Sequence, residues 1–268
     1  MQQRFSVRCF VRSTQPIYYE MKEALHMNTI KLDSKHVQMI AHRGLSGLER
    51  ENTCAAFVAA GNREKYYGIE TDIHSTSDGK FIIIHDDTTG RVCGGDNMTV
   101  EETTFDTLRK LQVSNLDDGQ RSRGDLILPT LEEYISIGKK YEKVCVLELK
   151  NEFPKEILYQ IIERIEELGY LDHTIFISFA LNNLIWLRER YPKQPAQYLL
   201  SKWGEDSMEI LKKYDLDLDI DYRQVTKELC DAIHAEGKII NCWTCNTAEE
   251  GAALVEMGVD QITTNILE

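Results

Sequence analysis

The segment Val144-Cys145-Val146-Leu147-Glu148-Leu149 is an apolar run of strand length, and a helical pattern over residues 154–168 follows it. Within the helical segment, apolar residues recur every three or four positions and share one face: Ile157, Ile161, Ile165 and Leu168. A strand followed directly by an amphipathic helix is the repeating unit of a parallel sheet covered by helices.

The same alternation continues to the end of the chain. Further strands are predicted at residues 174–178, 197–200, 216–220, 238–243 and 261–264, with helices at 181–191, 205–214, 225–236 and 247–257. Gly169, Gly237 and Gly258 stand where helix C-caps are expected. Two earlier strands, residues 39–42 and 68–73, bring the count to eight. The chain is therefore predicted to be an α/β protein with a TIM (β/α)8 barrel.

A ninth strand-like run, residues 81–85, is separated from Ile73 by only seven residues. A parallel crossover needs a dozen or more residues, so this run is predicted to be an extra antiparallel hairpin strand after the second barrel strand. With Asp78-Gly79 as a two-residue turn, Asp72 lies opposite His85. A turn of three or four residues would shift that register.

Length predicts one barrel domain, residues 37–268, after an N-terminal extension, residues 1–36. Three arginines precede the first acidic residue, Glu20, which faintly resembles an organelle transit peptide. A true start at Met27 is a second interpretation. The third is an extension packed on the barrel, with a helix at residues 16–26.

Composition excludes several classes of function. The formal net charge of −13 argues against a general nucleic-acid surface, which needs a basic footprint. Seven cysteines without a framework indicate free thiols in a reducing compartment, so we expect a cytoplasmic protein. The sequence contains no run of 18 apolar residues, so it predicts no membrane span. The sequence leaves the oligomeric state open.

Polar residues end several of the predicted strands and would meet at the C-terminal mouth of the barrel, where TIM-barrel active sites lie. These residues are His42, Glu70, Asp72, Glu148 and Lys150, with Trp243 near the end of the seventh strand. The three carboxylates suit a hard divalent ion, Mg²⁺ or Ca²⁺. Each one alone would be interpreted as a solvated or salt-bridged acid.

Histidines and cations complete the predicted chemistry. His42 and His85 suit general acid and base catalysis because imidazole titrates near neutral pH, although a lone histidine is usually structural. Arg43 offers a planar fork for phosphate oxygens, or else a salt bridge to a metal-site carboxylate. Lys150 would place a point charge on the phosphate. An acid, a base, a phosphate clamp and a metal site are the equipment for cutting a phosphodiester.

In this order, the motifs resemble the glycerophosphodiester phosphodiesterase family over residues 38–264. They are Ala41-His42-Arg43-Gly44, Glu51-Asn52-Thr53, Glu70-Thr71-Asp72, His85-Asp86, Glu148-Leu149-Lys150 and Trp243-Thr244. The resemblance implies a divalent ion at the three carboxylates and a small glycerophosphodiester substrate, such as glycerophosphocholine or glycerophosphoethanolamine. The products would be glycerol 3-phosphate and an alcohol.

The resemblance also implies a two-step mechanism through a cyclic phosphate. His42 is assigned as the base and His85 as the acid, although these roles are interchangeable on sequence grounds. Direct attack by water is the competing mechanism. Trp243 and Phe179 are candidate walls for the substrate, with core packing as the alternative for Trp243.

Three residues near the motifs, Arg50, Asn52 and Asn265, either have two interpretations or differ from the family pattern. Asn52 is a candidate substrate contact or the N-cap of the helix that follows it. Arg50 stands where the family usually has proline. Asn265 stands where the family often has aspartate, and we expect this exchange to alter only a peripheral contact.

Three rival functions remain. An enzyme of the same barrel acting on lysophospholipids would need an apolar rim, for which Ile127-Leu128 is a small candidate. A catalytically silent binding barrel should have lost a metal carboxylate or a histidine, yet all are present. A carboxylate-pair glycosidase leaves Arg43, Lys150 and the histidines unexplained.

Overall fold

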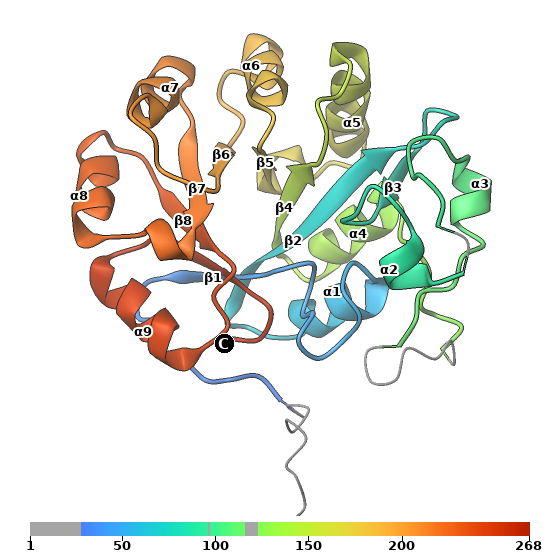
Figure 1. Ribbon diagram of the computed structural model, residues 1–268, viewed down its shortest axis with the longest axis horizontal. Helices are drawn as coiled ribbons and strands as arrows, with labels where there is room; N and C mark the ends of the chain where they lie inside the picture. Colours follow the sequence, from blue (N-terminus) through green and yellow to red (C-terminus); the bar gives the residue numbers. More distant parts are fainter. Residues whose placement is uncertain (1–27, 96, 116–122) are drawn as a thin grey trace, which may run out of the picture.

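The computed structural model describes residues 28–95, 97–115 and 123–268. Within this part of the chain, eight parallel strands pair in the order β1-β9-β8-β7-β6-β5-β4-β2, and pairing of β1 with β2 closes the ring (Figure 1). They are β1 (Gln38–Ala41), β2 (Tyr66–Ser75), β4 (Val144–Leu149), β5 (Thr174–Ser178), β6 (Ala196–Leu200), β7 (Asp217–Asp221), β8 (Ile240–Trp243) and β9 (Gln261–Thr264). The predicted barrel is confirmed.

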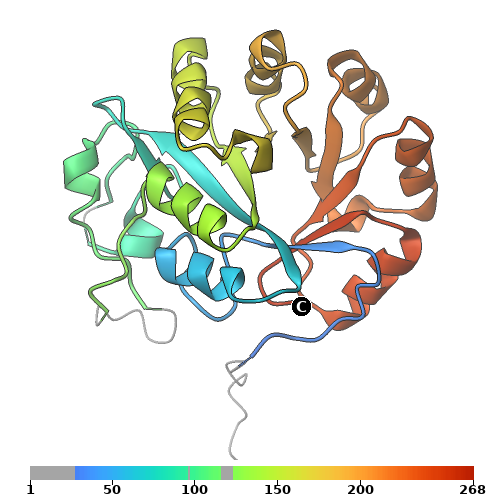
Figure 2. The same cartoon turned by 180° about the vertical axis from the view of Figure 1, so that it is seen from behind.

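Helices cover the outside of the strands, as the two opposite views show (Figures 1 and 2). They are α1 (Cys54–Gly61), α4 (Leu131–Lys140), α5 (Lys155–Glu167), α6 (Leu181–Arg190), α7 (Ser207–Tyr214), α8 (Lys227–Ala235) and α9 (Ala248–Met257). Threonine N-caps begin α1, α4, α8 and α9 by accepting a hydrogen bond from the first helical turn. Two 3-10 turns, η1 (Leu171–His173) and η2 (Tyr222–Gln224), join strands to helices.

The segment between the hairpin and α4 is largely irregular. Its described residues form the one-turn helices α2 (Gly90–Cys93) and α3 (Phe105–Leu108). The hydroxyl of Thr103 donates to the Thr99 carbonyl (2.7 Å), a local bond that competes with helix formation. Apolar side chains here, among them Val92 and Leu108, form a small core of their own against the hairpin.

Two groups of buried side chains come from the barrel strands. One is an apolar cluster of Ile40, Val146, Ile175, Ile177 and Leu199. The other is polar and hydrogen-bonded: Gln197 donates to Gln261 (2.8 Å) and Asn241 donates to Thr263 (3.1 Å). These buried polar side chains satisfy one another.

The extra strand is β3 (Phe81–Ile83), antiparallel to β2 as predicted, but its predicted register is wrong by one residue. Ile84, not His85, lies opposite Asp72, and its N–H donates to the Asp72 carbonyl (3.1 Å). The cause is a three-residue turn: Thr76 N–H donates to the Lys80 carbonyl (2.8 Å), and Gly79 takes a positive φ of 72°. His85 follows the end of the strand.

Residues 28–36, the described part of the predicted extension, lie against the C-terminal segment. Ile30 N–H donates to the Ile266 carbonyl (3.0 Å), and Leu32 N–H donates to the Glu268 carbonyl (2.8 Å). The helix predicted at residues 16–26 lies outside the described residues. In the described ranges, no helix is both long enough and apolar enough to cross a bilayer.

Candidate active site

A cavity of about 120 Å³ opens at the carboxyl ends of the barrel strands. Eight of the predicted site residues line it: His42, Arg43, Glu70, His85, Glu148, Lys150, Phe179 and Trp243. The two others, Asp72 and Asn52, lie buried next to the lining residues. The predicted convergence on one mouth is therefore confirmed, while the individual roles stay predictions.

The three predicted metal ligands form a buried cluster. Glu70 and Asp72 come from β2, and Glu148 lies beside Asp72 on β4. One carboxylate oxygen from each lies within 4.8 Å of the others. Burial, together with the neighbouring carboxylates, raises the pKa of Glu70 well above its usual range and that of Glu148 to about 7. Such crowded negative charge fits a divalent cation held among these oxygens.

Asp72 is held by cations and by Asn52. Although burial opposes ionisation, Arg43 and Lys150 keep the pKa of Asp72 below its usual range. The side-chain amide of Asn52 donates to Oδ2 of Asp72 (2.7 Å), and its oxygen accepts from Thr71 (2.7 Å). Oδ1 of Asp72 accepts no hydrogen bond from any described residue, which leaves it available to an ion.

Asn52 is therefore a support for the carboxylate cluster, while its predicted substrate contact stays a prediction. The interpretation of Asn52 as an N-cap is wrong, because Thr53 caps α1 by accepting from Ala56 N–H (3.2 Å).

The turn after β1 places Arg43 over the cluster. Arg43 has a positive φ of 54°, and its N–H donates to Glu70 (2.7 Å). Gly44 follows with φ 75°, and a Cβ there would lie 2.6 Å from the backbone of Ala56, so only glycine fits. The guanidinium pairs with Glu51 (2.9 Å) and lies 3.6 Å from Asp72. The salt bridge considered from sequence is thus present, and the side chain still lines the cavity.

His42 is held by Asn265, and the expectation that Asn265 makes only a peripheral contact is wrong. Nδ1 of His42 lies 2.7 Å from Oδ1 of Asn265, which also accepts from Ser46 (2.9 Å). Burial, with a contribution from Arg43, lowers the pKa of His42 to about 4. With Nδ1 donating to the amide oxygen, Nε2 is left as a proton acceptor, 4.0 Å from Glu70.

His85 is held by a chain of charges that leads back to Arg43. Nδ1 of His85 lies 2.7 Å from Asp86, and Arg91 of α2 binds both Asp86 (2.6 Å) and Glu51 (2.8 Å). Glu51 in turn pairs with Arg43. Hydrogen bonds from Arg91 hold the pKa of Asp86 well below its usual range, so Asp86 is a fixed anion beside the imidazole.

Phe179 and Trp243 line the cavity, while their contact with substrate stays a prediction. The rings of Phe179 and Trp243 meet edge to face, with centroids 5.6 Å apart. Phe179 is 42% exposed at the mouth. The apolar rim considered for a lysophospholipid enzyme is not found at Leu128, which is buried in the small core.

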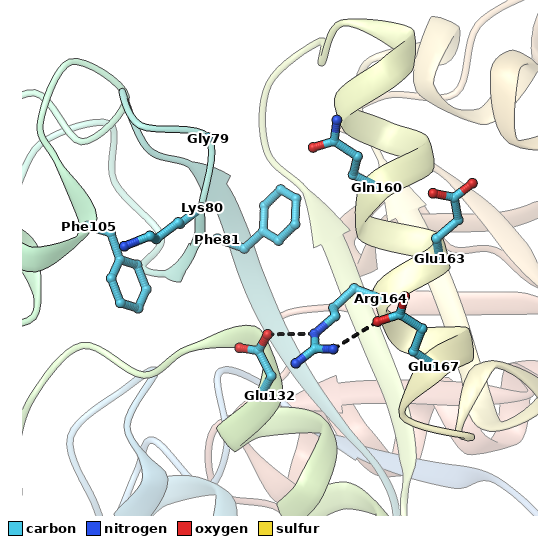
Figure 3. Close-up of a pocket in the computed structure, with 9 residues that line it drawn as sticks. All are labelled: Gly79, Lys80, Phe81, Phe105, Glu132, Gln160, Glu163, Arg164 and Glu167. Atoms are coloured by element: carbon cyan, nitrogen blue, oxygen red, sulfur yellow. Dashed lines mark hydrogen bonds and ion pairs between the residues drawn. The ribbon is translucent and has the colours of Figure 1, made fainter.

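A larger, more open hollow of about 360 Å³ lies elsewhere, between the β2–β3 hairpin and helices α4 and α5 (Figure 3). Its charged side chains already have partners. Arg164 binds Glu132 and Glu167, each at 2.8 Å, and the ammonium of Lys80 lies 5.0 Å from the ring of Phe105. The hollow holds none of the predicted site residues.

Comparison with known proteins places the fold and the site in one family. A family profile described as the glycerophosphoryl diester phosphodiesterase family matches residues 42–268. The chain belongs to this family. YhdW of Bacillus subtilis is 30% identical over 242 residues, which cover 85% of this chain and 93% of that protein.

Other members agree in sequence and structure. A glycerophosphodiester phosphodiesterase of Caldanaerobacter subterraneus is 29% identical over 85% of this chain and 93% of its own length. The solved structure of an Oleispira antarctica phosphodiesterase, in complex with the product sn-glycerol-3-phosphate, superimposes with a TM-score of 0.75. It is 25% identical and covers 88% of this chain and 96% of that one.

In this member of the family, four residues of the site were not assigned their contacts from sequence. Asp86, noted only as part of a motif, and Arg91 hold His85 and follow the hairpin in an irregular segment where spacing predicts little. Asn265 directly follows the last strand and Asp219 lies on β7, so the strand-end pattern would have placed both near the mouth but would not have predicted their contacts.

Proposed function

We propose that the protein is a metal-dependent glycerophosphodiester phosphodiesterase that converts glycerophosphocholine or glycerophosphoethanolamine to glycerol 3-phosphate and an alcohol. Its family membership makes it a phosphoric diester hydrolase. The observation that carries the proposal is the buried cluster of three carboxylates with two histidines and two cationic side chains in one cavity. The Oleispira antarctica relative with bound sn-glycerol-3-phosphate supports the choice of substrate.

Glu70, Asp72 and Glu148 would hold the divalent ion, Mg²⁺ or Ca²⁺. When bound, the ion supplies positive charge that offsets the charge of the phosphate and of the transition state. Arg43 and Lys150 line the same cavity and would bind phosphate oxygens, Arg43 through its planar fork.

The histidines would move the protons. Nε2 of His42 accepts the proton of the glycerol 2-hydroxyl, whose oxygen forms a bond to phosphorus as the bond to the head-group alcohol breaks. His85 gives its proton to the departing alcohol. In the second step His85 takes a proton from water, the water oxygen bonds to phosphorus as the bond between phosphorus and the glycerol 2-oxygen breaks, and His42 returns its proton to that oxygen. The hydrogen bond between Nδ1 of His42 and Asn265 orients one ring for these transfers, and the bond between Nδ1 of His85 and Asp86 orients the other.

The test is release of glycerol 3-phosphate by wild type, His42→Asn and His85→Asn in Mg²⁺ or Ca²⁺. We expect either substitution to lower kcat by about 100-fold or more, because each removes one proton transfer. His234→Asn is the matched control, since His234 lies on the surface and its ring pairs with Asp260 (2.9 Å), away from the cavity. Rapid quenching should trap a cyclic phosphate. Full activity in both variants would contradict the proposal, and cleavage of lysophospholipids alone would favour the rival substrate.

A further inference from the structure

Asp219 is a buried acid of the cavity to which the proposed mechanism gives no role. It lies on β7 beside Leu199 of β6, is 1% exposed, and lines the cavity. Its Oδ1 has no hydrogen-bond partner among the described residues. A buried polar atom without a partner costs stability, which indicates that something outside the protein satisfies it.

Trp243 supplies a second polar atom without a partner in the same cavity. Its indole Nε1 is buried and donates to no described residue. Asp219 pairs across β7 and β8 with Asn241, two residues before Trp243, so the two inward-facing side chains are diagonal neighbours. One is a hydrogen-bond acceptor and the other a donor.

Asp219 lies outside the carboxylate cluster and has apolar neighbours. The group that could hold a metal contains Glu70, Asp72 and Glu148 but not Asp219. Leu199 pairs with Asp219 across β6 and β7, and Ile177 and Phe179 line the same cavity. Besides its ionic groups, the cavity therefore offers apolar walls with one unpartnered donor and one unpartnered acceptor among the described residues.

We propose that Asp219 and Trp243 form a hydroxyl-binding subsite, which holds the glycerol end of the substrate and selects it over an alkyl chain. A hydroxyl group satisfies both atoms at once, because it accepts from the indole N–H and donates to the carboxyl oxygen. The carbon atoms of the same ligand pack against Ile177 and Leu199. A cationic head group would satisfy the acid but leave the indole N–H without a partner. This subsite rests on the proposed function for the identity of its ligand.

The test compares binding of sn-glycerol 3-phosphate, n-propyl phosphate, phosphocholine and inorganic phosphate by calorimetry, with Mg²⁺ or Ca²⁺ present. We expect wild type to bind glycerol 3-phosphate about tenfold or more tightly than n-propyl phosphate, since only the former has hydroxyls. Asp219→Leu and Trp243→Phe should each remove most of this preference and leave the affinity for inorganic phosphate within twofold. Asp219→Asn, which keeps a polar amide, should retain most of it.

Asp221→Asn is the matched control on the same strand, because Asp221 faces Arg223 and does not line the cavity. No preference in wild type, or an equal preference in Asp219→Leu, would overturn the inference. Loss of phosphocholine affinity in Asp219→Leu with glycerol 3-phosphate unaffected would also overturn it, in favour of a cation subsite. Hydrolysis is measured separately on the same wild-type protein. If wild type prefers glycerol 3-phosphate to n-propyl phosphate but does not hydrolyse glycerophosphodiesters, the proposed function alone is refuted. If it hydrolyses them but shows no such preference, the subsite alone is refuted.

Discussion

At the scale of single residues, a neutral side chain, that of Asn265, holds His42. Asn265 accepts the hydrogen bond from Nδ1 of His42 but adds no negative charge beside the ring. The pKa of His42 therefore stays at about 4, set by burial and by Arg43. A neutral His42 at physiological pH is ready to accept the proton of a hydroxyl group.

Asn265→Asp should move the acid limb of the pH profile. A carboxylate beside the imidazole stabilises its protonated form and raises the pKa of His42, so a higher pH is needed to free the base. We expect the acid limb of kcat/KM to move upward by about one pH unit. Asn265→Ala should lower kcat without an upward shift. An unchanged acid limb in Asn265→Asp would show that His42 does not control it.

Prediction from sequence succeeded at this scale where one rule applied. Residues that end parallel strands meet at one mouth, and this placed His42, Glu70 and Glu148 together. The contact between Asn265 and His42 escaped because it joins the two ends of the barrel chain, across the β1–β9 pair. Such a contact depends on barrel closure in three dimensions, which spacing along the chain does not report.

At the scale of elements, the short helix α2 supports the acid side of the site. Arg91 on α2 binds both Asp86 and Glu51. Asp86 holds His85, and Glu51 pairs with Arg43. The hairpin delivers His85 to the mouth, but β3 ends at Ile83. The orientation of His85 therefore depends on this charge network and not on strand pairing.

Arg91→Leu should reduce kcat by about tenfold and leave the affinity for glycerol 3-phosphate nearly unchanged. Arg91 is half exposed, so the loss of stability should be below about 1 kcal/mol. Arg123→Leu is the matched control, because Arg123 has similar exposure but pairs with Glu49 and Asp125 away from His85. Equal kcat in both variants would show that the network does not orient His85.

The boundaries of most elements follow from sequence, while the hairpin register does not. The strands Val144–Leu149, Thr174–Ser178 and Gln261–Thr264 match their predictions residue for residue. The register shifted because Asp78 accepts hydrogen bonds from Thr76 (2.7 Å) and from the N–H of Phe105 (2.8 Å), which stabilises a three-residue turn. The second bond comes from a residue distant in sequence, so local turn rules do not predict it.

At the scale of the whole molecule, the protein concentrates part of its negative charge inside the barrel. The raised pKa values of Glu70 and Glu148 mean that the folded state holds protons there more tightly than the unfolded state. Their contribution to stability is full below the ordinary value of 4.5 and is lost as pH rises through the raised values. The lowered pKa of His42 acts oppositely, but only below its ordinary value of 6.5.

Without divalent ions, stability should therefore fall as pH rises from 6.5 to 8. Glu148 alone should contribute a loss of about 1 kcal/mol over this range. Glu148→Gln should flatten the dependence, and thermal unfolding in EDTA at several pH values measures it. Stability that rises with pH in this window would contradict the raised pKa values.

The overall architecture could be predicted because six of the eight barrel strands, with their helices, repeat with short connections from Val144 onward. The segment between β3 and α4 could not, since its small core depends on contacts with the hairpin. The place of Asp219 in the cavity was not predicted either, because the sequence does not show which cavity a strand residue lines.

The most direct test of the central claim is release of glycerol 3-phosphate from glycerophosphocholine in Mg²⁺, in Ca²⁺ and in EDTA. It compares wild type with Glu70→Gln, and Glu49→Gln serves as a surface control that pairs with Arg123. We expect EDTA to abolish release by wild type, a divalent ion to restore it, and Glu70→Gln to lose about 100-fold or more in either ion. Release that continues in EDTA, or full activity in Glu70→Gln, would contradict a metal-dependent phosphodiesterase built on this carboxylate cluster.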